Sequence, residues 1–213
     1  MRGNVPFLQF GWVLAAAFGA VIFAGGFGQV SEKTAVVDIS RVVEQSNFGK
    51  SNQDAFAKMK EARESLLVFI DTNRVLTNEQ GQRIKDLSLK PNPTAEETAE
   101  LERLKADVVA AAKRSPELAT KPNLTPEERN LLEEYARRGQ TMDANAQRWL
   151  REFTTEMQNW ADKQKLDSIT RARAAIQQVA KAQGYTLVFE IGVAPYGAND
   201  ISDAVLTAMN AKT

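Results

Sequence analysis

The sequence predicts a mainly α-helical protein with a small β head: a long antiparallel helical hairpin on a short-stranded β body that is completed by oligomerisation. Three observations favour this fold class. Residues 50–183 are rich in Ala, Glu, Lys, Arg, Gln and Leu, with glycine only at Gly81 and Gly139. Two short β-type stretches flank that tract, at 33–39 and 186–191. The chain then closes with a Gly/Pro-rich turn and a short helix, which a simple coiled coil does not need.

The N-terminus has the character of a targeting segment. Arg2 is the only charged side chain before Glu32, and residues 7–27 are strongly apolar. About 20 apolar residues are enough to span a bilayer, whereas the apolar core of a cleaved secretory signal is shorter. Both alternatives stay open, so residues 1–28 are expected to be either a signal peptide or a membrane anchor formed by residues 5–28. Either alternative predicts export across a membrane.

The composition excludes several classes of site. The chain has 27 basic and 27 acidic residues, no histidine and no cysteine. This balance lacks the strong positive field of a nucleic-acid-binding protein, so no nucleic-acid partner is expected. Cys/His metal sites, thiol nucleophiles and Ser-His couples cannot be built without those residue types. We therefore expect no cofactor, no metal site and no enzyme activity.

Apolar residues of the helical tract recur in alternating steps of three and four, as they do in a coiled coil. The first run spans residues 59–87 and the last spans residues 132–160, so the two are expected to pack together as the limbs of an arm over residues 49–183. Trp149, Phe153 and Trp160 follow the seam spacing. Packing within the arm is therefore their predicted role.

Proline and capping signals divide this arm. Breaks are expected near 90–93 and 115–125, because proline lacks the backbone donor and clashes with the preceding turn. Thr94 with Glu97, and Thr125 with Glu128, are capping boxes that begin new helices. The turn of the hairpin is expected within 115–125. The segment from 94 to 114 either extends the outward limb or folds back as a third helix at the tip.

The head is expected to consist of residues 29–48 and 184–213. Strand alternation places one face of each strand inward and directs Glu190 toward water. Two or three short strands are too few to be stable alone, so the head should need strands from other subunits. The predicted oligomerisation residues are the inward-pointing apolar side chains of both strands, Val37, Ile39, Leu187, Phe189 and Ile191.

Both ends of the chain resemble the Skp/OmpH family of periplasmic chaperones. At the N-terminal end, the resemblance lies in the strand, short helix and S-x-x-G-K entry to the arm over residues 35–50. At the C-terminal end, it lies in the helix end, Gly184-Tyr185, the following strand and turn, and Asp200-Ile-Ser-Asp-Ala-Val-Leu206. These segments cover about a third of the chain, in the family's order, with a helical tract between them.

The resemblance implies a homotrimer in which a small β-barrel body carries three helical arms around a cavity. Members of the family hold unfolded outer-membrane proteins there without ATP. The implied partners are thus unfolded outer-membrane or other exported proteins, and the implied compartment is the periplasm, with membrane contact if the N-terminal segment is an inner-membrane anchor. The arms here are longer, closer to neutral and interrupted by proline.

A holdase needs apolar side chains that meet its client. The predicted client contacts are the leucines next to the helix breaks, where the seam pattern fails and exposure is expected, namely Leu87, Leu89, Leu118 and Leu124. The alternative function is a membrane-anchored coiled-coil scaffold or stalk of the cell envelope. The strand and glycine-rich ending argues against a stalk, because such proteins stay helical.

Overall fold

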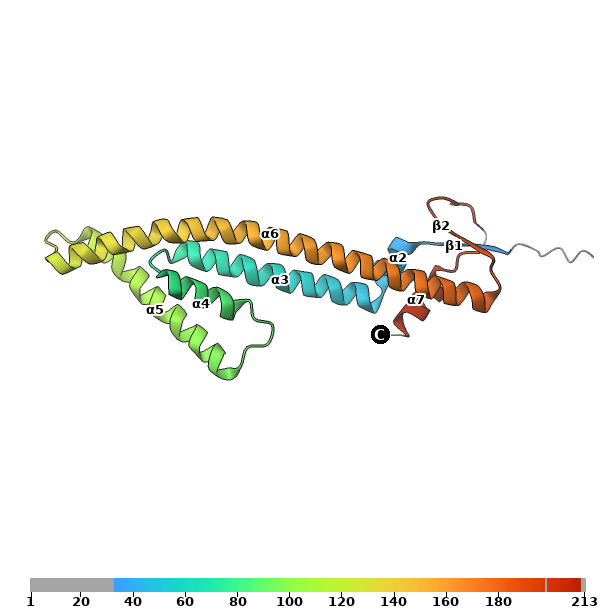
Figure 1. Cartoon of the computed structure of the whole chain (residues 1–213), viewed down its shortest axis with the longest axis horizontal. Helices are drawn as coiled ribbons and strands as arrows, with labels where there is room; N and C mark the ends of the chain where they lie inside the picture. The colour runs from blue at the N-terminus through green and yellow to red at the C-terminus, as the bar shows by residue number, and fades with distance from the viewer. Residues whose placement is uncertain (1–32, 198, 212–213) are drawn as a thin grey trace, which may run out of the picture.

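The computed structural model describes residues 33–197 and 199–211, so the signal-or-anchor prediction for the apolar N-terminal segment lies outside the described residues. The elements in chain order are β1 (Thr34–Val37), α2 (Ile39–Gln45), α3 (Asn47–Thr72), α4 (Asn78–Ser88), α5 (Ala95–Thr120), α6 (Pro126–Gln183), β2 (Leu187–Glu190) and α7 (Ser202–Asn210). Figure 1 shows a long helical arm that extends from a small head, where both ends of the described chain meet. None of the described helices combines the length and the apolar character that crossing a membrane requires.

The head is built around β1. β2 pairs with it in parallel, with Thr34 beside Leu187. On the other edge of β1, the backbone N–H of Val36 donates to the Asn199 carbonyl, and the N–H of Ile201 donates to the Val36 carbonyl. A core from both chain ends and the end of α6 lies against one face of this sheet, formed by Ala35, Val37, Val42, Ala172, Ala175, Val179, Ile201, Val205 and Met209.

Two predictions for the strands are wrong. The first strand ends at Val37, because Asp38 caps the helix α2 by accepting a hydrogen bond from the backbone N–H of Arg41. The faces of β2 are also reversed: Val188, beside Ala35, packs on the core, whereas Leu187 and Phe189 point away from it. Successive residues of a strand point to opposite faces of the sheet. The pairing of Val188 with Ala35 therefore determines which side chains of β2 face the core.

A tight corner joins the head to the arm. Ser46 caps α3: its hydroxyl accepts from the N–H of Gly49 at 2.9 Å and donates to the carbonyl of Val43 at 2.8 Å. A Cβ atom on Gly49 would lie 1.9 Å from that same Val43 oxygen. The S-x-x-G pattern thus encodes a helix cap together with a close backbone crossing.

Gly49→Ala is therefore expected to destabilise the protein by about 1–3 kcal/mol, since the backbone must shift to admit the methyl group. Gly139→Ala is the matched control, because a Cβ atom there would come no closer than 3.8 Å to Arg74. Alanine at position 139, inside α6, should stabilise the protein by about 0.5–1 kcal/mol. Urea unfolding of both variants tests the pair. Equal effects would contradict the role assigned to the corner.

In the arm, α3 and α6 lie side by side and run in opposite directions (Figure 1). Phe56 and Arg63 of α3 contact Trp160 and Glu156 of α6, and Arg74, just after α3, contacts Asp143 nearer the start of α6. The outward limb doubles back, however. α3 stops at Thr72, and α4 returns along it before α5 runs out again toward the tip.

The arm consequently differs from a plain two-limb hairpin. The additional break at 73–77 was not predicted, although Thr77 and Gln80 form a capping box there. The break predicted over 115–125 is confirmed only for 121–125, because α5 continues through Pro116 to Thr120 and α6 begins at Pro126. Proline forgoes one backbone hydrogen bond. Two residues later, Leu118 is buried in a cluster with Val75 and Tyr135.

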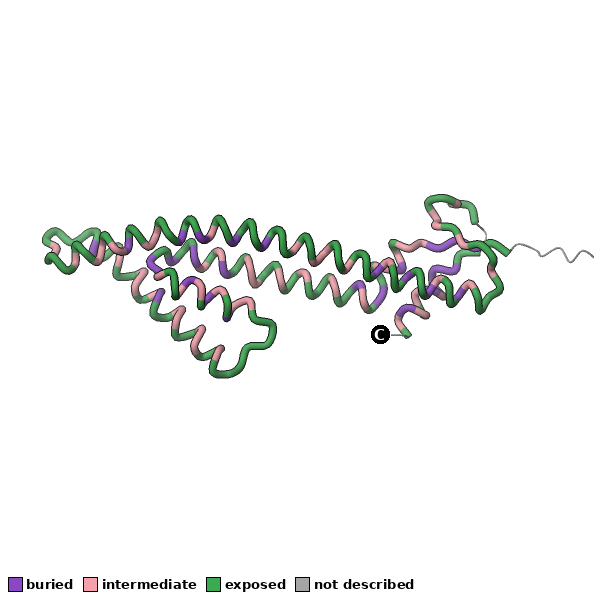
Figure 2. Tube along the Cα trace, viewed as in Figure 1, coloured by how far each residue is buried: buried purple, intermediate pink, exposed green. Residues whose placement is uncertain are grey.

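Two apolar cores result along the arm. The larger lies where four helices meet and consists of Leu66, Ile70, Leu76, Ile84, Val108, Met142, Trp149 and Phe153. The smaller lies nearer the tip and consists of Val75, Leu118 and Tyr135. Buried positions follow the inner sides of the helices in Figure 2, while the outer sides are exposed. The predicted packing role of Trp149 and Phe153 is confirmed.

Candidate protein-binding surfaces

The head presents apolar side chains on the outer face of β2. Leu187 is 46% exposed and Phe189 is 39% exposed. Val36 shares their face of the sheet but is buried, since Gly197 lies against it. In the part of the chain that the structure describes, β1 is the only strand paired with β2. The far edge of β2 therefore carries backbone donors and acceptors next to exposed apolar side chains.

The five predicted oligomerisation residues do not form one surface. Val37 is buried in the protomer's own core, and Ile39 packs against that core from the start of α2. Ile191 is partly exposed beyond the end of β2. Leu187 and Phe189 are thus the two members of the set on the outer face of the sheet.

The predicted client contacts are likewise not exposed. Leu87 of α4 is buried at 3% exposure, and Leu118 is buried in the smaller core at 5%. Leu89 and Leu124 are partly buried against the larger and the smaller core, respectively. The expected exposure is wrong because the chain turns at each break and packs the leucine before the turn against the neighbouring helix.

The two turns at 89–94 and 121–125 are copies of one motif. Residues 90–97 read Lys-Pro-Asn-Pro-Thr-Ala-Glu-Glu, and residues 121–128 read Lys-Pro-Asn-Leu-Thr-Pro-Glu-Glu. In both, the threonine and the last glutamate form the predicted capping box, and the lysine Nζ lies 2.6 Å from that glutamate. The repeat is visible in the sequence. It identifies Lys90 and Lys121 as ion-pair partners of the capping-box glutamates, which the capping boxes alone do not indicate.

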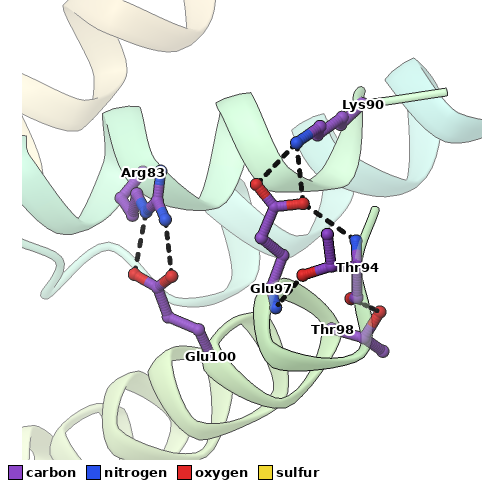
Figure 3. Close-up of polar contacts among 6 residues, drawn as sticks. All are labelled: Arg83, Lys90, Thr94, Glu97, Thr98 and Glu100. Carbon is purple, nitrogen blue, oxygen red and sulfur yellow. Dashed lines mark hydrogen bonds and ion pairs between the residues drawn. The ribbon is translucent and has the colours of Figure 1, made fainter. Parts of the chain in front are cut away.

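Figure 3 shows the first copy, where a second ion pair lies beside the turn. Arg83 of α4 donates to both carboxylate oxygens of Glu100 in α5, at 2.8 and 2.5 Å. The Lys90 ammonium and the N–H of Thr94 both donate to the Glu97 carboxylate, which lowers the pKa of Glu97 below its ordinary value. Arg83 lowers the pKa of Glu100 in the same way. These contacts hold α4 and α5 together as a hairpin.

A group whose pKa is lower in the folded protein stabilises it above the unfolded pKa and ceases to do so as the pH falls through the folded value. Glu97→Gln should therefore lower the thermal midpoint at neutral pH, and its difference from the wild type should shrink below about pH 4. Glu102→Gln is the control, because Glu102 is exposed and makes only a 3.9 Å ion pair with Lys105. A pH-independent difference for Glu97→Gln would contradict the role of the carboxylate.

Acidic residues serve as caps and ion-pair partners at these turns, and among the described residues no cluster of three or more acidic side chains is arranged to hold a metal ion. The features that distinguish the molecule are an exposed strand on a small head and a long helical arm.

The chain belongs to the OmpH-like family. The model of the family described as "Outer membrane protein (OmpH-like)" matches residues 33–209, which include both strands of the head and the whole arm. Comparisons with curated proteins and with solved structures find no match. The predicted family is confirmed, and it indicates a periplasmic chaperone of outer-membrane proteins.

Proposed function

We propose that the protein is an ATP-independent holdase for unfolded outer-membrane proteins and that it acts as a homotrimer. Membership of the OmpH-like family supports the client class. The proposed assembly is supported by the outer face of β2, where Leu187 and Phe189 are exposed. The adjacent edge of β2 pairs with no other strand among the described residues. Exposed strand edges with apolar side chains favour pairing with another chain. A second and a third copy would cover this surface.

In the proposed trimer, the heads join through β2 and three arms enclose a space for the client. The client is held by many weak apolar contacts, which lower the concentration of free unfolded chain and so prevent its aggregation. This effect needs no chemistry, because a binder shifts the client's equilibrium by mass action. The equal numbers of basic and acidic residues suit apolar contact better than long-range attraction of one charge sign.

Two measurements on the protein purified after expression of the full chain test the proposal. Sedimentation should give the mass of a trimer, and the protein should suppress aggregation of an outer-membrane β-barrel protein diluted from urea without added ATP. A stable monomer that leaves aggregation unchanged would refute the proposal. If the protein is such a monomer and is also found in the membrane fraction with Met1 intact, the results favour a membrane-anchored scaffold instead.

A further inference from the structure

We propose that a groove along one flank of the α3–α6 pair binds single apolar side chains of the unfolded client. The inference rests on the proposed function and names a binding site for it. The groove encloses about 340 Å³. Its apolar lining comes from both helices and consists of Phe56, Leu67, Leu150, Phe153, Met157 and Ala161. None of these residues was among the client contacts predicted from the sequence.

The groove combines a packed interior with an exposed apolar side chain. Phe153 is buried and belongs to the larger arm core, so the groove has a rigid wall. Leu150 is 55% exposed, although Trp149 and Phe153 beside it along α6 are buried. An apolar side chain that enters the groove would remove part of Leu150 from water, which is favourable in proportion to the area covered.

The opposite flank of the same helix pair is already covered by another helix of this chain. Leu67 of the groove lies about 160° around α3 from Phe69, because successive residues of an α-helix are about 100° apart. Phe69 borders α4 and α5, and Ile84 of α4 belongs with Trp149 to the larger arm core. α4 is therefore an intramolecular example of a largely polar segment that packs on this pair through a few apolar side chains.

The polar atoms at the groove favour a polypeptide over a lipid chain. Arg63 lines the groove and donates to the Met59 carbonyl and to Glu156, but its Nε is buried without an acceptor. Lys60, Glu64, Thr154 and Gln158 also line the groove. A peptide carries a carbonyl at every residue, whereas the hydrocarbon tail of a lipid has none. Strands of outer-membrane barrels alternate apolar and polar side chains, which suits a site that accepts isolated apolar groups.

A matched pair of variants tests the site. Leu150→Glu places a charge in the groove, and Leu166→Glu makes the same change at a leucine of α6 that is 65% exposed and lies outside it. Both should fold, because both side chains are largely exposed. We expect Leu150→Glu to raise the Kd for a fluorescent, urea-unfolded outer-membrane β-barrel protein about tenfold, and Leu166→Glu to change it less than about twofold.

The outcomes separate the site from the proposed function. If the wild type binds the client and the two variants bind equally well or equally poorly, the groove is not the site, while the holdase function stands. If the wild type does not bind, the proposed function itself fails.

Because the chain has no cysteine, a single introduced cysteine gives a second readout. An environment-sensitive dye at Leu150→Cys should become shielded from solvent when the unfolded barrel protein is added, whereas the same dye at Leu166→Cys should not. Shielding by detergent-free phospholipid vesicles instead of by the barrel protein would overturn the choice of a polypeptide as the occupant.

Discussion

Phe189→Glu is expected to convert the proposed trimer into folded monomers. Phe189 lies on the outer face of β2 and is 39% exposed in the protomer. Covering the exposed part of this ring contributes roughly 1 kcal/mol, and a carboxylate buried in its place adds a desolvation penalty of about 1–3 kcal/mol or more. Each interface should therefore weaken by at least about tenfold to a hundredfold. The proposed trimer has three such interfaces, so the effect on assembly should be large.

Sedimentation of the variant at several concentrations measures the change. Val68→Glu is the control, since Val68 is an exposed apolar residue of α3 in the arm. It should leave the oligomer intact. Circular dichroism should show unchanged helicity for both variants, because neither side chain belongs to a core. An intact oligomer after Phe189→Glu would mean that β2 is not the subunit interface.

The second large effect is expected at Trp149, which is fully buried where α3, α4 and α6 meet. A Cβ atom on Gly81 of α4 would lie only 3.5 Å from the Trp149 ring, and Lys85 of α4 lies over it with Nζ 5.3 Å from the ring centroid. Trp149→Ala removes the surface on which α4 rests. The expected loss of unfolding free energy is about 3–5 kcal/mol.

Trp149→Phe provides the matched comparison. The indole N–H of Trp149 is buried without an acceptor, which is itself unfavourable. Phenylalanine keeps most of the ring and removes that donor, so its cost should stay below about 1.5 kcal/mol. Urea unfolding gives both values, and hydrogen exchange should show lost protection of α4 in Trp149→Ala alone. Equal destabilisation by the two variants would contradict this account.

Much of the arm was predictable because its signals are local. A capping box depends on four consecutive residues, so Thr94 with Glu97 and Thr125 with Glu128 identified two helix starts directly. The spacing of Trp149 and Phe153 placed them in the core, since helical periodicity alone decides which side chains share a face. The family was recognisable from short motifs at both chain ends, and the corner at Ser46 and Gly49 gives one of them a physical meaning.

The sequence by itself thus determined the helical arm, its capped starts, the two-ended head and the family. Only the tertiary structure decided that α4 folds back, that Leu87 and Leu118 are buried at the turns, and that Leu187 and Phe189 rather than Val188 face outward. Each of these depends on a partner far along the chain: Trp149 for α4, Tyr135 for Leu118 and Ala35 for Val188. Local patterns indicate that a side chain needs burial, but the packing of distant segments decides which surface buries it and which surface stays exposed.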